Sequence, residues 1–145
     1  MNCPRCSTEL TTETYRGIEV DRCPHCEGMW LDYAELDQLE DTVMDEDRLK
    51  GTMMVRSDGS ELPCPRCSGP MRWFRYRYYN LELDFCEVEH GFWLDKGEEK
   101  RVLEIMEQRT KDLKRSASAE VEWGRFVSSL KSRSFKDRLK GMFRR

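Results

Sequence analysis

Residues 23–32 read CPHCEGMWLD, and residues 86–95 read CEVEHGFWLD. Both stretches begin with a cysteine and end with the run Gly-x-Trp-Leu-Asp. Each is preceded by a Cys-Pro-Arg-Cys sequence, at residues 3–6 and 64–67, so the whole pattern occurs twice in the chain. A repeated pattern of this kind predicts two modules that arose by duplication.

The composition predicts that these modules need a covalent or metal staple. The 145 residues are 38% hydrophobic and 37% charged, which is poor in core-forming side chains. Modules of about 40 residues fall below the size at which burial alone stabilises a fold. Seven cysteines are an odd number, which argues against a closed set of disulfides, and His90 completes two sets of four metal ligands.

The first set has the spacing C-x2-C, sixteen residues, C-x2-C, which is typical of a tetrahedral metal site. Its members are Cys3, Cys6, Cys23 and Cys26. A two-residue spacing lets both thiolates of a tight turn face one ion, while backbone amides stabilise their charge. Disulfides or unliganded thiols are the alternative. His25 stands between two ligands of a complete set, so we expect it to face solvent.

The second set departs from this pattern at its fourth ligand. Cys64, Cys67 and Cys86 hold the matching positions, but Glu89 stands where the first set has its last cysteine. His90 follows one residue later, and its longer side chain can reach the ion from there. We therefore predict His90 as the fourth ligand. The alternatives are that Glu89 is the ligand or that His90 is a surface histidine.

Four protein ligands in each set leave no open coordination position for water or substrate. The predicted cofactors are therefore two structural Zn²⁺ ions. Such zinc contributes about 10–16 kcal/mol of apparent free energy, so we expect metal binding and folding to be one event. Iron in a rubredoxin-like site of four cysteines, which supports electron transfer, is the alternative, although a histidine in the second set argues against a matched redox pair.

The chain divides into four predicted segments. They are residues 1–44, the first metal module with its helix; 45–62, a linker; 63–115, the second module with a longer helix; and 116–145, a basic amphipathic helical tail. Two apolar stripes in the tail, displaced around residues 132–134, predict a helix that is bent or broken there.

Local signals place a hairpin and a capped helix in each module. In the first, residues 10–22 alternate as a hairpin with its turn at Gly17, and Asp32 with Glu35 forms a capping box for a helix that runs to the acidic residues 45–47. In the second module, Asn80 takes the turn position. A further capping box, formed by Asp95 and Glu98, begins the longer helix.

Aromatic and basic residues alternate over residues 72–79, which read RWFRYRYY. As a strand, this stretch puts Trp73, Arg75, Arg77 and Tyr79 on one face, and the interleaved pattern suits single-stranded nucleic acid. The alternative is that one aromatic face is the core of the module. The candidate nucleic-acid contacts here are Arg72, Trp73, Arg75, Tyr76, Arg77 and Tyr79.

The tail segregates positive charge. Residues 124–145 hold eight Lys or Arg and one Asp, a net charge of +7, which leaves −10 for residues 1–123 of a chain whose net charge is −3. Such a tail can neutralise phosphates, lie on an anionic membrane, or dock on the acidic modules of its own or a neighbouring chain. Its candidate nucleic-acid contacts are Lys131, Arg133, Lys136, Arg138 and Lys140.

The expected location is the cytoplasm, because thiols with metal spacing need a reducing compartment. A cleaved signal peptide would remove the first ligand, Cys3, and no stretch approaches the roughly 20 apolar residues of a transmembrane helix. Neither feature supports a secreted or membrane-spanning protein.

With these residues in view, the chain resembles the bacterial transcription factor IIB-type zinc-ribbon family. The residues that carry the resemblance are Cys3-Pro4-Arg5-Cys6, Val20-Asp21-Arg22-Cys23, Gly28-Met29-Trp30-Leu31-Asp32 and Glu35, with Cys64-Pro65-Arg66-Cys67, Leu83-Asp84-Phe85-Cys86, His90-Gly91-Phe92-Trp93-Leu94-Asp95 and Glu98 in the second copy. The resemblance implies a small metal-stabilised α+β fold, with two tandem zinc ribbons built on β-hairpin knuckles, each followed by a helix, plus the C-terminal amphipathic helix.

The resemblance implies little about activity, because zinc ribbons serve many functions. We expect a non-enzymatic zinc-binding adaptor or regulatory protein, related to transcription, that contacts a protein or nucleic acid and takes no small-molecule substrate. Self-association through the C-terminal helix is a further expectation. The alternatives are a membrane-surface adaptor held by the tail and a catalytic or redox protein using the repeated carboxylates Asp21, Asp32, Asp84 and Asp95.

Overall fold

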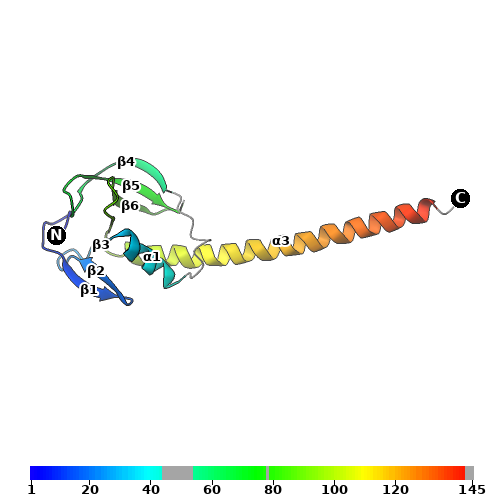
Figure 1. Ribbon diagram of the computed structural model, residues 1–145, viewed down its shortest axis with the longest axis horizontal. Helices are drawn as coiled ribbons and strands as arrows, with labels where there is room; N and C mark the ends of the chain where they lie inside the picture. Colours follow the sequence, from blue (N-terminus) through cyan, green and yellow to red (C-terminus); the bar gives the residue numbers. More distant parts are fainter. Residues whose placement is uncertain (44–53, 78, 143–145) are drawn as a thin grey trace. The chain divides into compact units, whose positions relative to one another are not determined.

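The computed structural model describes residues 1–43, 54–77 and 79–142, with side chains from residue 59 in the second range and up to residue 129 in the third. Two compact units are present, Met1–Glu107 and Gln108–Arg145. The first unit holds the strands, helix α1 (Tyr33–Asp41) and the start of helix α3 (Glu98–Met142), whose remainder belongs to the second unit (Figure 1). The fold is the small α+β type that the sequence predicts.

A hairpin opens the first module, which is defined here as residues 1–43. Strands β1 (Thr11–Tyr15) and β2 (Ile18–Arg22) pair antiparallel around a two-residue turn. Both turn residues have positive φ, 51° at Arg16 and 84° at Gly17, the combination required by the type I′ turn that suits a twisted hairpin. The predicted turn position is confirmed.

Helix α1 begins as predicted and ends early. Asp32 caps it by accepting from the Glu35 backbone N–H at 2.8 Å, while the Glu35 carboxylate accepts from the Asp32 N–H at 2.8 Å. The last helical residue is Asp41, followed by the C-cap Thr42, whose hydroxyl donates to the Leu39 carbonyl at 2.7 Å. The predicted continuation to residues 45–47 lies outside the described residues.

The second module, defined here as residues 54–107, repeats this plan with one added strand. Strands β5 (Pro70–Tyr76), β6 (Glu82–Cys86) and β7 (Phe92–Leu94) correspond to the three strands of the first module, in which β3 (Met29–Leu31) is the third. Strand β4 (Met54–Pro63) pairs with the outer edge of β5 and occupies much of the predicted linker. Its sequence is mostly polar, with Val55 as its one strand-forming residue, so the pairing depends largely on backbone groups that the edge of β5 offers.

The second hairpin has a longer turn than the first. Its loop lies between Tyr76 and Glu82, and the Tyr76 N–H donates to the Leu81 carbonyl at 2.8 Å. Arg77 takes the left-handed conformation there, with φ at 49°. The two hairpins therefore differ at the position where the sequence predicts that Asn80 replaces Gly17.

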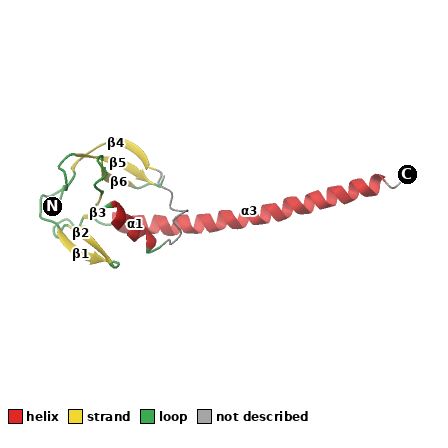
Figure 2. Ribbon diagram, in the orientation of Figure 1, coloured by secondary structure: helices red, strands yellow, loops and turns green. Residues whose placement is uncertain are grey.

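The two modules form one seven-stranded sheet, in the order β1-β2-β3-β7-β6-β5-β4, whose strands are yellow in Figure 2. The modules join where β3 pairs antiparallel with β7, with Trp30 opposite Trp93. These two tryptophans hold equivalent positions in the repeat, so the junction has an approximate twofold symmetry about the tryptophan pair. Each module thus pairs with the other through the same three-residue strand.

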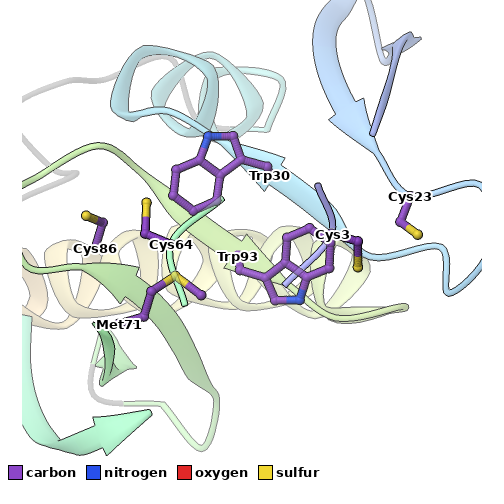
Figure 3. Packing of buried hydrophobic residues seen from close by; sticks show 7 residues of the cluster. All are labelled: Cys3, Cys23, Trp30, Cys64, Met71, Cys86 and Trp93. Carbon is purple, nitrogen blue, oxygen red and sulfur yellow. The ribbon is translucent and has the colours of Figure 1, made fainter. Parts of the chain in front are cut away.

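The buried core lies at this junction. Trp30 and Trp93 form one cluster with Met71 and four of the cysteines, Cys3, Cys23, Cys64 and Cys86, and Figure 3 shows the indoles among cysteines of both ligand sets. Each indole also packs against the equivalent glycine of the other module. A Cβ on Gly28 would lie 2.9 Å from Trp93 Cε2, and a Cβ on Gly91 would lie 2.9 Å from Trp30 Cζ2.

Helix α3 runs without interruption from Glu98 to Met142. The sequence predicts a first helix ending near residue 115 and a bent or broken helix around residues 132–134. The continuous helix shows that the predicted end near residue 115 and the predicted break are both wrong. No proline interrupts this stretch. Serine side chains can compete with the helix for backbone hydrogen bonds, but here two of them donate to carbonyl groups of the helix itself. Ser118 donates to the Lys114 carbonyl at 3.0 Å, and Ser129 to the Phe126 carbonyl at 2.8 Å.

Candidate metal centres

Each cysteine pair sits on a tight knuckle in which backbone groups fix the direction of the side chains. In the first knuckle, the Cys3 N–H donates to the Thr8 carbonyl at 2.7 Å, and the Ser7 N–H donates to the Cys3 carbonyl at 2.9 Å. Ser7 has a positive φ of 59°, which turns the chain back on itself. The knuckles that begin at Cys23 and Cys64 repeat this arrangement, with positive φ four residues after the first cysteine, at Glu27 (61°) and Ser68 (59°).

The fourth knuckle closes over the same span as the others, with the Cys86 N–H donating to the Gly91 carbonyl at 3.0 Å, but its inner turn is one residue tighter, and this explains the change of ligand. Here the Glu89 N–H donates to the Cys86 carbonyl at 2.9 Å, and Glu89, three residues after the cysteine, has the positive φ of 63°. Glu89 is therefore the residue that reverses the chain. His90, the next residue, turns its ring inward and brings Nδ1 within 3.4 Å of Cys86 Sγ.

The two ligand sets converge on separate points. Cys3, Cys6, Cys23 and Cys26 bring their sulfurs within 4.8 Å of one another, and Cys64, Cys67, Cys86 and His90 do the same with three sulfurs and one ring nitrogen. Individual Sγ separations are 3.5 Å for Cys3 and Cys26, 3.4 Å for Cys6 and Cys23, and 3.7 Å for Cys67 and Cys86. A tetrahedral ion with Zn–S bonds of about 2.3 Å requires sulfurs about 3.8 Å apart, so both sets fit zinc.

In the first knuckle of each module, the surroundings give the two thiols different pKa values. Burial raises the pKa of Cys3 and that of Cys64 to about 12. The Thr8 hydroxyl lowers the pKa of Cys6 to about 5, and the Gly69 backbone amide lowers that of Cys67 to about 7. Metal binding therefore has to displace a proton from the buried thiol, Cys3 or Cys64.

One comparison with known proteins identifies the first of these sites. Residues 2–42 match the model of the transcription factor IIB-type zinc-ribbon family, which is described as "Transcription factor zinc-finger". The first module is similar to a transcription factor IIB-type zinc ribbon. No curated protein and no solved structure matches the chain.

The second module repeats the strand order of the first around its own ligand set, and both modules are called zinc ribbons below. Its donors are three cysteines and a histidine, and together the two ribbons fit two structural zinc ions. Zinc at either site would be held by protein ligands alone and would supply folding energy.

The strand predicted to contact nucleic acid is divided between core and surface in the second zinc ribbon. Tyr76 is buried, and its hydroxyl donates to Glu40. Arg77 is 9% exposed and holds the same carboxylate, with Nη2 2.8 Å from Glu40 Oε2. Arg72 is exposed but ion-paired with Glu87. A ligand on this surface would therefore meet Trp73, which is 37% exposed, together with Arg75 and the partly exposed Tyr79.

The tail candidates follow the zinc ribbons on helix α3. Lys131, Arg133, Lys136, Arg138 and Lys140 lie on its helical backbone, and their side chains are outside the described residues. Among the described residues, none of the helices has both the length and the apolar character of a membrane span.

Several side chains that tie the two zinc ribbons together were not singled out by the sequence. Glu40 of α1 is 6% exposed and pairs with Arg77 and Tyr76 of the second ribbon. Arg5, in the first knuckle, pairs with both carboxylate oxygens of Asp95. The sequence offers only a weak signal for these contacts, because Glu40 stands at a helical position where an apolar residue would ordinarily be expected.

The repeated carboxylates have structural partners in the zinc ribbons. Asp32 caps α1, Asp21 accepts from the Thr12 hydroxyl at 2.8 Å, and Asp95 accepts from Trp93 Nε1 at 3.0 Å. Asp84 is 4% exposed, and burial raises its pKa. Its Oδ1 has no hydrogen-bond partner among the described residues. These contacts give structural roles to Asp21, Asp32 and Asp95.

Proposed function

We propose that the protein is a non-enzymatic, zinc-stabilised adaptor in transcription-related machinery, whose ribbon sheet contacts a protein or nucleic acid. The observation that carries this proposal is the closed character of both ligand sets, each of which has four protein donors around one point. A metal without an open position cannot activate water or substrate. Its contribution is to hold a small sheet rigid enough to present a surface.

The surface best suited to a partner is the exposed side of β5. Trp73 and Arg75 alternate with buried residues there, so an aromatic ring and a guanidinium face solvent from a strand that is fixed on its other side. Rings and guanidinium groups of this kind stack on unpaired bases, and they are also enriched at protein interfaces.

Crosslinking in cells with the zinc-loaded full chain, followed by nucleic-acid and mass analysis, tests the proposal. We expect a reproducible nucleic acid or protein to be recovered, and Trp73→Ala with Arg75→Glu to reduce its recovery about tenfold or more. Lys100 is another exposed cation of the first unit, so Lys100→Glu is the charge-matched control and should change the recovery little. Recovery of no reproducible partner, or equal loss in both variants, contradicts the proposal.

A further inference from the structure

The two zinc sites differ in how well their cysteines are covered. Cys67 is exposed to solvent, whereas the other six cysteines are buried or half-buried. Its counterpart in the first site, Cys6, is half-buried and packs against the core cluster at the junction of the modules. A reagent dissolved in water therefore reaches the second ligand set through Cys67.

A single difference between the repeats accounts for this exposure. Thr8 stands two residues after Cys6, and its hydroxyl oxygen lies 3.3 Å from the Cys6 sulfur. Gly69 holds the equivalent position after Cys67, so the second site has no side chain there to cover the sulfur. A Cβ on Gly69 would lie 3.4 Å from Cys67 Sγ, which is an ordinary contact, and the backbone of Gly69 lies outside the left-handed region. A side chain could therefore cover Cys67, and the sequence leaves it out.

A second cysteine lies within reach of the exposed one. Cys86 Sγ is 3.7 Å from Cys67 Sγ. The bond of a disulfide is about 2.05 Å long, so the two sulfurs need to approach by less than about 2 Å to form one. Cys86 is buried, so an oxidant from solvent meets Cys67 first. An accessible thiolate beside a resolving cysteine is the arrangement typical of redox-sensitive cysteines.

We propose that Cys67 is a site of oxidation by hydrogen peroxide, at which a disulfide with Cys86 replaces the bound zinc. The Cys67 thiolate attacks the peroxide, so that an S–O bond forms, the O–O bond breaks and hydroxide leaves. The Cys86 thiolate then attacks the sulfur of this sulfenic acid, so that an S–S bond forms, the S–O bond breaks and a second hydroxide leaves.

The electrons balance between the cysteine pair and the oxidant. The two sulfurs together lose two electrons, and the two oxygens of the peroxide gain them. Zinc then leaves as Zn²⁺, because a disulfide has no thiolate to offer and two of the four ligands are lost. The proposal goes beyond the adaptor function and does not depend on it.

Treatment of the zinc-loaded full chain with hydrogen peroxide tests the proposal. We expect zinc release, measured with a chromogenic chelator, and a disulfide between Cys67 and Cys86 in mass analysis of the earliest samples. Early samples identify the site that reacts first, because both sites support one sheet. A dithiol reductant with added zinc should restore the metal content, since a disulfide is reversible and the higher oxidation states of cysteine are not.

Exchange of the covering residue between the sites provides matched variants. Gly69→Thr should cover Cys67 and slow zinc release several-fold, and Gly69→Ala, which adds only the Cβ, should slow it less. Thr8→Gly should uncover Cys6 and let the first site react as early as the second. Gly59→Ala is the control, because its Cβ would meet open space, and it should release zinc at the wild-type rate. Equal zinc content before peroxide separates covering from a change in folding.

Three results would overturn the proposal. They are a zinc content that peroxide leaves unchanged, early oxidation of cysteines of the first site while Cys67 stays reduced, and equal rates of zinc release in the wild type, Gly69→Ala and Gly69→Thr.

Discussion

Glu89 and His90 show how a shift of one residue changes the chemistry of a ligand. Because Glu89 takes the left-handed backbone conformation of the knuckle, its side chain is exposed, and the next residue faces the cysteines. An imidazole is longer than a thiol, so it can reach the ion from this later position. The exchange therefore follows from the tighter turn.

His90→Ala should weaken metal binding at the second site by about 100-fold or more, since even side chains that only support a ligand contribute about 10–100-fold. Cobalt absorption distinguishes a site of three sulfurs and one nitrogen from a site of four sulfurs, so it reports each site separately. His25→Ala is the matched control, because His25 is exposed and outside both sets. Unchanged cobalt affinity in His90→Ala, with a loss in Glu89→Ala, would transfer the ligand role to Glu89.

Glu98 gives the first unit a pH dependence. Burial raises the pKa of Glu98 to about 7, against about 4.3 for a free glutamate. Between these values the folded state binds more protons than the unfolded state, so the free energy of unfolding falls as pH rises and levels off above about pH 7.

Glu98→Gln removes this titration and keeps the side-chain oxygen that accepts from the Asp95 N–H at 2.8 Å. With excess zinc, the variant should be more stable than the wild type, and its advantage should grow from pH 6 to pH 8. Urea unfolding at several pH values measures this difference. A constant advantage, or one that is largest at pH 6, would contradict the assignment.

At the scale of elements, helix α1 is fastened to the second hairpin by a buried ion pair. Arg77 and Glu40 are both almost fully buried, and the guanidinium contacts both carboxylate oxygens, at 2.8 and 3.3 Å. Removing one partner of such a pair leaves an uncompensated charge, whereas replacing both with apolar residues is often tolerated.

Arg77→Met should therefore lower the free energy of unfolding by about 3–5 kcal/mol, and Glu40→Leu with Arg77→Met should recover much of the loss. Lys96→Met breaks the exposed pair with Glu27 and should cost less than about 1 kcal/mol. Denaturant unfolding of the three zinc-loaded variants gives these values. Equal effects of Arg77→Met and Lys96→Met would show that the buried pair contributes no more than a surface pair.

Close packing of each tryptophan on a glycine of the other module holds the two halves of the sheet together. Gly28 has ordinary backbone geometry, so alanine is excluded there only by the Trp93 ring. Gly28→Ala should cost about 1–3 kcal/mol, the usual range for overpacking, and a smaller side chain in place of Trp93 should reduce that penalty. A double-mutant cycle of Gly28→Ala and Trp93→Leu measures this coupling, with Gly124→Ala as control. Additive effects would mean that the contact does not join the modules.

Sequence patterns predicted the elements better than their assembly. Ligand spacing, the Gly17 turn and the Asp32 capping box are local signals, carried by residues a few positions apart. The pairing of β3 with β7 joins residues more than 60 positions apart through strands of only three residues, which give no periodic signal. The tryptophan in each of these strands packs on the equivalent glycine of the other module, a contact that no local pattern indicates.

At the scale of the whole molecule, the shared sheet predicts that the two metals are coupled. Stripping zinc with a chelator should abolish the strand signal and the near-ultraviolet signal of Trp30 and Trp93 in one cooperative step, since both indoles lie in the cluster that contains cysteines of both sites. His90→Ala should then weaken the first site also. Two separate steps, with the first ribbon intact after the second has lost metal, would show that the modules fold independently.

Metal analysis that finds iron would contradict the assignment of zinc.

The symmetric junction has one more consequence, which concerns association between chains. A ribbon separated from its neighbour would present β3 or β7 as a free edge, with unpaired backbone groups beside an uncovered indole. Because the two edges are nearly identical in sequence, the most complementary surface available to a lone ribbon is another ribbon of its own kind. Carrying both copies on one chain gives each edge a partner at high effective concentration, and so protects the protein from polymerising through its own strands.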